Sequence, residues 1–265
     1  MKLGISIINA AGEILASSQW EDEVFLAYRD TYHEGDKIVF TCEKPDQFLM
    51  VRLVNAIAPA LILLKGTEGV YEIPFGDDRK IYVPTAFDGN RHYLHIRIAR
   101  KEEISARKNL SLNPAATHSF GGFYPFASAN VETRGEMVFA AKNAIDGVLA
   151  NNNHGRWPYT SWGINRDPNA ALKLEFGRKV AADELVIYLR ADFPHDAWWE
   201  QATVHFSDGT DMVLKLEKTH AGQRFTFEKK LIEWLVIDSL IKAEDPSPFP
   251  ALTQLEVWGY EACLC

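Results

Sequence analysis

Short segments of alternating apolar and polar residues fill the first hundred positions of the chain, without a long helical pattern between them. Successive side chains of a strand point to opposite faces, so this alternation is typical of half-buried strands. Turn-forming residues such as Gly35-Asp36 and Gly66 separate the segments. Strands are predicted at residues 5–8, 14–16, 24–28, 37–42, 48–54, 61–64, 70–73 and 93–98. This series predicts an antiparallel sandwich of the jelly-roll type.

The second half of the chain shows the same pattern after one segment of a different kind. Residues 101–110 are charged and favour a helix, and we interpret residues 101–120 as a connector between a domain of residues 1–100 and a domain of residues 121–265. Helical turns are expected at 137–145, and strands at 127–131, 172–176, 185–189, 202–206, 212–216, 225–227, 232–237 and 255–258. The sequence therefore predicts an all-β fold of two antiparallel β-sandwich domains.

The charge of the chain argues against two classes of partner. Its 265 residues carry a formal net charge of −8 and the pI is about 5.5, so neither nucleic acid nor an anionic membrane is an expected partner. The first residues read as a strand and a hairpin, because Asn9 and Gly12 interrupt their apolar stretch. Cys42, Cys263 and Cys265 have the spacing of neither a disulfide framework nor a zinc site. We expect a cytoplasmic protein with reduced thiols.

One segment combines many charged and aromatic side chains, and it connects the predicted strands at 185–189 and 202–206. It contains Arg190, His195, three carboxylates (Asp192, Asp196 and Glu200) and the adjacent Trp198 and Trp199. The C–H faces of a sugar stack on aromatic rings and its hydroxyls bond planar polar groups, so this combination suits a saccharide site. A structural interpretation stays open, in which one tryptophan caps the core and Arg190 pairs with Asp192.

A second long connection, residues 151–165, is polar and irregular but contains Trp157, Tyr159 and Trp162. Loops of this length are usually functional or disordered, and the aromatic residues argue against disorder. We predict that this connection and the one at 190–200 come together and form one open pocket in the second domain.

Three pieces of the second half together resemble a known family. They are Ala144-Ile145-Asp146-Gly147 with a loop that ends in Ser161-Trp162, the strand at 172–177, and the closing segment at 251–259. In their order and spacing, residues 121–265 resemble the discoidin, or coagulation-factor type C, domain of the galactose-binding-like superfamily, which includes many carbohydrate-binding modules. The resemblance implies an eight-stranded sandwich in which loops at one end hold a glycan.

The same resemblance implies a structural calcium ion near the Asp146-Gly147 turn. Asp146 would supply a carboxylate, and Asn143 and residues of the following loop would supply carbonyl oxygens, while the glutamate expected in the closing strand is Gln254 here. Calcium requires several oxygen ligands and matching charge, so the neutral amide predicts weak binding or none. Asp146 could instead cap its own turn.

Our main hypothesis is non-catalytic binding of a mono- or oligosaccharide. The predicted ligand-binding residues are Trp157, Arg190, Asp192, His195, Asp196, Trp198, Trp199, His154, Asn165 and Arg166. A charged group bonding a hydroxyl contributes about 1.5–3 kcal/mol, and stacking on an indole about 1 kcal/mol more. A single sugar is therefore expected to bind in the micromolar to millimolar range.

Two alternatives from other classes stay open at this point. The first is a glycoside hydrolase or lyase, in which Asp192 and Asp196 orient His195 as a general base, or Asp192 and Glu200 act as paired carboxylates. The second is a structural module, possible as a homo-oligomer, whose aromatic loops are buried at an interface.

Overall fold

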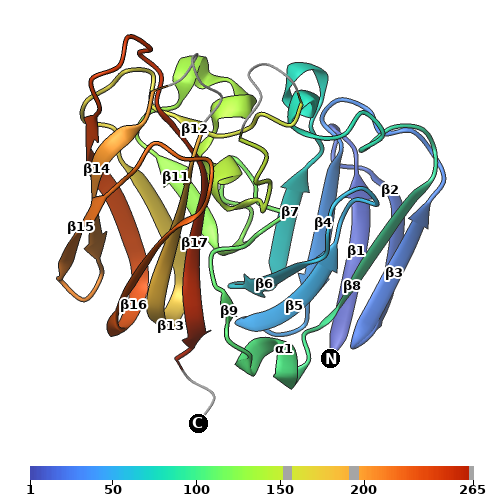
Figure 1. Ribbon diagram of the computed structural model, residues 1–265. Helices are drawn as coiled ribbons and strands as arrows, with labels where there is room; N and C mark the ends of the chain where they lie inside the picture. The colour runs from blue at the N-terminus through green and yellow to red at the C-terminus, as the bar shows by residue number, and fades with distance from the viewer. Residues whose placement is uncertain (152–156, 191–196, 263–265) are drawn as a thin grey trace. The chain divides into compact units, whose positions relative to one another are not determined.

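The computed structural model describes residues 1–151, 157–190 and 197–262, which form two compact units. The first unit contains Met1–Ile104 and Asn113–Tyr124, and the second contains Ser105–Leu112 and Pro125–Cys265. The stretch interpreted as a connector, residues 101–120, thus divides between the units and holds the short helix α1 (Lys101–Ser105) and the strand β9 (Lys108–Asn109). Nearly all other regular structure is strand, so the all-β prediction is confirmed (Figure 1).

The first unit is a sandwich of two antiparallel sheets. One sheet has the strand order β2-β1-β4-β7, and the other has the order β10-β6-β5-β8-β3. The bounds are β1 Lys2–Ile8, β2 Ile14–Glu21, β3 Glu23–Tyr28, β4 Lys37–Cys42, β5 Gln47–Arg52, β6 Ala60–Leu64, β7 Glu68–Glu72, β8 His92–Ile98 and β10 Phe123–Tyr124, with the 3₁₀ helix η1 at Gly76–Ile81. All eight strands predicted in residues 1–100 are present.

The core of this unit forms between its two sheets, as the alternation predicted. Ile5 and Phe40 of one sheet and Leu49 and Ile96 of the other are completely buried. Gly69 pairs with Phe40 across β4 and β7, and a Cβ there would lie 2.2 Å from the Phe40 ring. Because the ring occupies the space of a side chain, only glycine fits at this position.

The second unit contains the remaining strands and three 3₁₀ helices. The bounds are β9 Lys108–Asn109, β11 Phe126–Ala129, η2 Thr133–Gly135, η3 Met137–Phe139, η4 Ala141–Ile145, β12 Trp162–Gly163, β13 Leu172–Leu189, β14 Trp199–Phe206, β15 Asp211–Lys215, β16 Gln223–Lys242 and β17 Ala251–Glu261. Hydrogen bonds join the strands in the order β12-β17-β13-β16-β14-β15, with β11 beside β13 and β9 beside β17. All pairings are antiparallel.

Two strands of the second unit are longer than the sequence predicted. The segments at 172–176 and 185–189 belong to one strand, β13, and those at 225–227 and 232–237 belong to β16. The β13–β16 register shifts between Glu175 and Val180 and again between Ala182 and Glu184. A bulge adds residues without ending the pairing, so the pattern of alternation breaks although the strand continues.

Side chains from several strands of this sheet meet inside the second unit. Ile187 and Leu189 of β13 lie with Trp199 of β14, Leu214 of β15 and Trp162 of β12 around a small interior space. Leu185 and Val186 are both buried, as their continuous apolar run predicted. In the described part of the chain, no helix has the length and apolar character needed to cross a membrane.

Candidate functional site

A pocket of about 320 Å³ lies in the second unit, where segments distant in sequence meet. Its walls come from η2, η3, the turn after β12, the end of β13 and the start of β17. The lining residues are Thr133, Arg134, Phe139, Tyr159, Gly163, Ile164, Asn165, Arg166, Arg190, Phe249, Pro250 and Ala251. This volume lies in the range of small-ligand sites.

Arg190 forms the buried side of the pocket. Its backbone N–H donates to the carbonyl oxygen of Ala251 at 2.9 Å, which continues the pairing of β13 with β17 beyond Leu189 and Leu252. The side chain is only 5% exposed, and its guanidinium carbon lies 5.9 Å from the centroid of the Tyr159 ring. The strand pairing therefore fixes where this cation lies.

Arg166 forms the open side of the pocket, on a tight turn. Asn165 and Arg166 have φ values of 48° and 62°, and the backbone N–H of Asn165 donates to Thr133 Oγ1 at 2.9 Å. The exposed Arg166 guanidinium lies 4.4 Å from the centroid of Phe249, within the range of a cation–π contact. Within the described residues, this guanidinium has no carboxylate partner.

Arg134 is the third arginine of the pocket, and it is paired. Its Nε and Nη2 donate to the two oxygens of Glu136 at 2.6 and 2.7 Å, and its guanidinium lies 5.3 Å from the Phe139 ring centroid. Arg134 also has a positive φ, of 54°. Three of the four described non-glycine residues with positive φ in this unit thus line the pocket, and such backbone strain concentrates at functional sites.

The described lining residues offer two kinds of interaction. Guanidinium groups present planar arrays of N–H donors, and Phe139, Tyr159 and Phe249 present apolar ring faces. No carboxylate is among the lining residues in the described part of the chain. This chemistry suits a flat ligand that has both C–H faces and hydrogen-bond acceptors.

The predicted ligand-binding residues fall into three groups. Asn165, Arg166 and Arg190 come together in the pocket. Trp157, which is 48% exposed, is not among the lining residues, and neither is the half-buried Trp198, whose ring lies 4.9 Å from Lys218 Nζ. His154, Asp192, His195 and Asp196 lie outside the described residues.

Trp199 does not face the solvent, so the prediction of an exposed stacking ring there is wrong. It is 2% exposed, and its ring centroid lies 6.2 Å from that of Trp162 in the interior. The β14–β16 register shifts between Trp199 and Gln201 and again before Thr203. These irregularities turn both Trp199 and Ala202 inward, whereas strict alternation would place them on opposite faces.

Sequence reasoning missed Thr133, Arg134, Phe139 and Phe249 as site residues. Trp157 was selected because it is an aromatic residue in an irregular loop. Phe249 meets the same criterion, since it stands in the short proline-rich loop Pro248-Phe249-Pro250. Arg134 and Phe139 gave no such signal, since they lie in short helical turns whose contacts depend on the folded chain.

Asp146, Asn143 and Gln254 were predicted as calcium ligands, and each is engaged within the protein. Asp146 Oδ1 accepts the backbone N–H of Val148 at 2.7 Å, which is the turn-capping role considered as the alternative. Gln254 Oε1 accepts the N–H of Gly147 at 3.1 Å, and Asn143 Nδ2 donates to the Met137 carbonyl at 2.8 Å. Burial raises the pKa of Asp146 to about 7, against the lowering effects of the Val148 N–H and of Lys142.

These three side chains alone do not fit a calcium ion. Calcium takes six to eight oxygen ligands, whereas the three side chains offer one carboxylate and the unpartnered Asn143 Oδ1, because Gln254 Oε1 is already bonded. The unpartnered atom of Gln254 is its Nε2, an amide nitrogen that cannot bind a cation. In the described part of the chain, no group of three or more His, Cys, Asp or Glu side chains could hold a metal ion.

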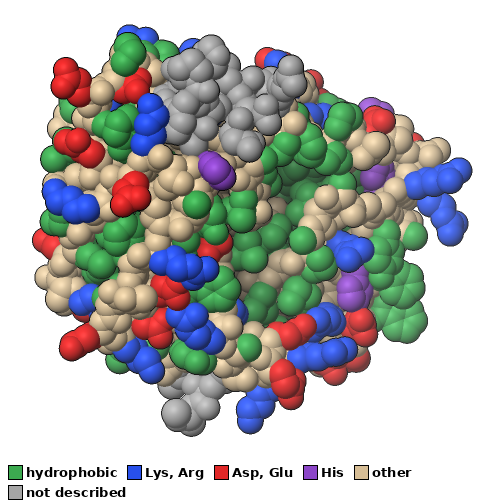
Figure 2. All heavy atoms as spheres, in the orientation of Figure 1, with side chains coloured by type: hydrophobic (Ala, Val, Ile, Leu, Met, Phe, Trp, Pro, Cys, Tyr) green, Lys and Arg blue, Asp and Glu red, His purple; other side chains and the backbone are tan. Residues whose placement is uncertain are grey.

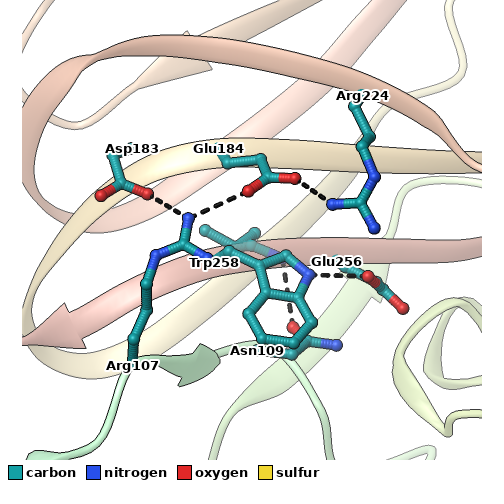
Figure 3. A network of polar contacts seen from close by, with 8 residues as sticks. Arg107, Asn109, Asp183, Glu184, Arg224, Glu256 and Trp258 are labelled. Atoms are coloured by element: carbon teal, nitrogen blue, oxygen red, sulfur yellow. Dashed lines mark hydrogen bonds and ion pairs between the residues drawn. The ribbon is translucent and has the colours of Figure 1, made fainter.

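A second arginine cluster of this unit surrounds β9 (Figure 3). Arg107 Nη2 donates to Asp183 Oδ1 at 2.6 Å and to Glu184 Oε2 at 2.9 Å, and Arg224 pairs with the other oxygen of Glu184. The Arg107 guanidinium lies 5.6 Å from the Trp258 ring centroid. Here carboxylates neutralise the arginines, and the contacts join the segment before β9 to β13, β16 and β17.

Neither a family model nor a curated protein matches this sequence. Among solved structures the chain is similar to carbohydrate-binding modules. One is the family 32 module of C. perfringens NanJ in complex with galactose, with 20% identity and a TM-score of 0.39 over 50% of this chain and 91% of the module.

Two further similar structures have comparable scores. The Streptococcus pneumoniae fucose binding module SpX-3 has 13% identity and a TM-score of 0.43, over 58% of this chain and 99% of that module. The lectin domain of lectinolysin complexed with Lewis B antigen has 16% identity and a TM-score of 0.42, over 59% of this chain and 98% of that domain.

Proposed function

We propose that the second unit is a non-catalytic saccharide-binding module and that the pocket between Arg166 and Arg190 is its binding site. One observation carries this proposal: rings and guanidinium groups from separate segments line one cavity of about 320 Å³. A pyranose needs this pairing of apolar faces with planar donors. The galactose, fucose-binding and Lewis B structures similar to this chain name the ligand class to test first.

The expected affinity is weak. Each charge-assisted hydrogen bond contributes about 1.5–3 kcal/mol and each aromatic contact about 0.5–1.5 kcal/mol, from which the cost of association must be subtracted. A monosaccharide is therefore expected to bind in the micromolar to millimolar range. The hydrolase or lyase alternative depends on Asp192, His195 and Asp196, which lie outside the described residues.

Substitution of the open ring of the pocket tests the proposal. Phe249 is 41% exposed and Arg166 packs over it, so Phe249→Ala should remove most retention on a glycan array. Tyr260→Ala is a matched control, because that ring is 39% exposed in the same unit and Lys229 lies over it at 5.7 Å, outside the pocket. Loss of retention in both variants, or retention of no glycan by the unsubstituted protein, would contradict the proposed site.

A further inference from the structure

The charged residues that line the pocket differ from those on the face of the molecule that Figure 2 draws. Figure 2 shows Asp and Glu interspersed with Lys and Arg over the face that it draws. The described lining residues of the pocket instead include the exposed Arg166 and no acid, and Arg134 is paired with Glu136. A ligand in this pocket therefore meets the guanidinium of Arg166, and no acid lies among the described lining residues.

Arg166 is the arginine available to a ligand. Its guanidinium packs on Phe249 through one face, and no hydrogen bond or ion pair holds its N–H groups within the described part of the chain. Asn165, beside it, is exposed and brings a neutral amide rather than a charge. The tight turn and the Phe249 ring together hold the guanidinium at the pocket, so less side-chain entropy is lost when a ligand binds.

The geometry of a guanidinium favours one kind of acceptor. Two parallel N–H groups match the two oxygens of a carboxylate, and such charge-assisted pairs are about twice as strong as neutral hydrogen bonds. A sugar hydroxyl uses the same donors less fully, because it is neutral and accepts at one oxygen. The pocket offers no described carboxylate that would repel an acid or compete with it for Arg166.

We propose that this pocket selects a saccharide that carries a carboxylate, such as a uronic acid, and that Arg166 binds the carboxylate. The proposal rests on the proposed function, because it names the substituent that the same saccharide site prefers. Phe249 would stack on the ring of the sugar while Arg166 pairs with the acid attached to it.

Isothermal titration of the full chain with matched sugars tests this selectivity. The probes are the methyl glycosides of galactose and of galacturonic acid, and those of glucose and of glucuronic acid, since the members of each pair differ only in whether C6 is a hydroxymethyl group or a carboxylate. We expect about tenfold tighter binding of the acid in at least one pair at low salt, and a smaller preference at high salt, because screening weakens the pair at the exposed Arg166. Equal affinities within both pairs would overturn the proposal but leave the proposed function standing, whereas binding of none of the four would contradict the function itself.

Variants test whether the preference for the acid depends on Arg166 or on the overall charge of the protein. Arg166→Gln should abolish the preference for the acid, so that the two members of each pair bind with similar affinity, and it should weaken binding of the neutral sugar less than binding of the acid. Arg107→Gln is the matched control, because Arg107 also lies over an aromatic ring but is paired with Asp183 and Glu184, and it should change neither affinity. An acid preference that survives in Arg166→Gln would overturn the assignment of this residue. Tighter binding of galactose 6-sulfate than of either uronate would overturn the choice of carboxylate.

Discussion

The second unit holds two clusters in which an arginine packs on an aromatic ring, and they differ in what surrounds the cation. Arg107 lies 5.6 Å from the centroid of Trp258 and donates to Asp183 and Glu184. Arg166 lies 4.4 Å from the centroid of Phe249 and has no carboxylate partner in the described residues. An arginine on an aromatic ring therefore joins strands at Trp258, whereas at Phe249 the N–H groups of the arginine stay available to a ligand. The difference is whether described carboxylates pair with the arginine.

The pKa values of two buried carboxylates of this unit, Glu184 and Asp146, are shifted in opposite directions. Hydrogen bonding from Arg107, with Arg224, lowers the pKa of Glu184 despite its burial. Burial raises the pKa of Asp146 to about 7, because only the Val148 N–H and the charge of Lys142 oppose it. Of these two buried carboxylates, Glu184, which guanidinium groups contact, is stabilised in its charged form, whereas Asp146 is not.

The largest effect on stability is expected at Glu184, whose side chain is 10% exposed. Glu184→Gln keeps the size of the side chain but leaves Arg107 and Arg224 with a neutral partner. Because Arg224 is 64% exposed and can be hydrated, we expect a loss of about 2 kcal/mol in the free energy of unfolding rather than the full cost of a broken buried pair. Urea denaturation measures this loss, and saccharide affinity should not change. Unaltered stability would show that the network around β9 contributes nothing.

The second test places a carboxylate next to the pocket arginine, as Asp183 and Glu184 lie next to Arg107. Asn165→Asp places a carboxylate beside Arg166, at a positive φ that Asp tolerates. The new acid should pair with Arg166 and repel an acidic sugar, so affinity for galacturonate should fall about tenfold, which corresponds to about 1.4 kcal/mol. Titration with galactose is the control and should give a change of less than about threefold. Unchanged galacturonate binding would mean that the open guanidinium does not define selectivity.

The pH dependence of stability should separate wild type from Glu184→Gln. The folded-state pKa of Glu184 is lowered, so its contribution is present above its usual pKa, about 4.3, and is lost as the pH falls through the lower folded-state value. The difference in unfolding free energy between the two proteins should therefore be constant from pH 7 to about pH 5 and shrink below about pH 4.3. A difference that persists at pH 2.5 would show that charge is not its source.

The smallest effect on stability is expected from the addition of calcium, for which Asp146 is a predicted ligand. Its donor set does not fit the ion, so addition of millimolar calcium chloride or of EDTA should leave the thermal midpoint within about 1 °C. A ligand at a thousand times its dissociation constant stabilises by about 4 kcal/mol, which would raise the midpoint by several degrees. A rise of that size, lost in Asp146→Asn, would show that the site holds calcium.

The strands could be predicted from the sequence because alternation is a local property. Each of the eight strands predicted in residues 1–100 overlaps a strand of the structure, and Leu172, Leu174 and Phe176 are buried in β13 as their spacing indicated. The candidate site could be predicted only in part. Asn165, Arg166 and Arg190 line the pocket, whereas Trp199 points into the core.

The sequence by itself determined which segments form strands and that the chain is all-β, since a period of two requires only neighbouring residues. The tertiary structure decided what the bulges and the strand pairing control: that Trp199 turns inward, that β13 and β16 run on through their irregularities, and that Phe249 reaches Arg166. It also decided that Arg107 meets carboxylates while Arg166 meets none among the residues that the structure describes. Residues far apart in the chain make these contacts, and their separation in space is fixed only when the sheets form.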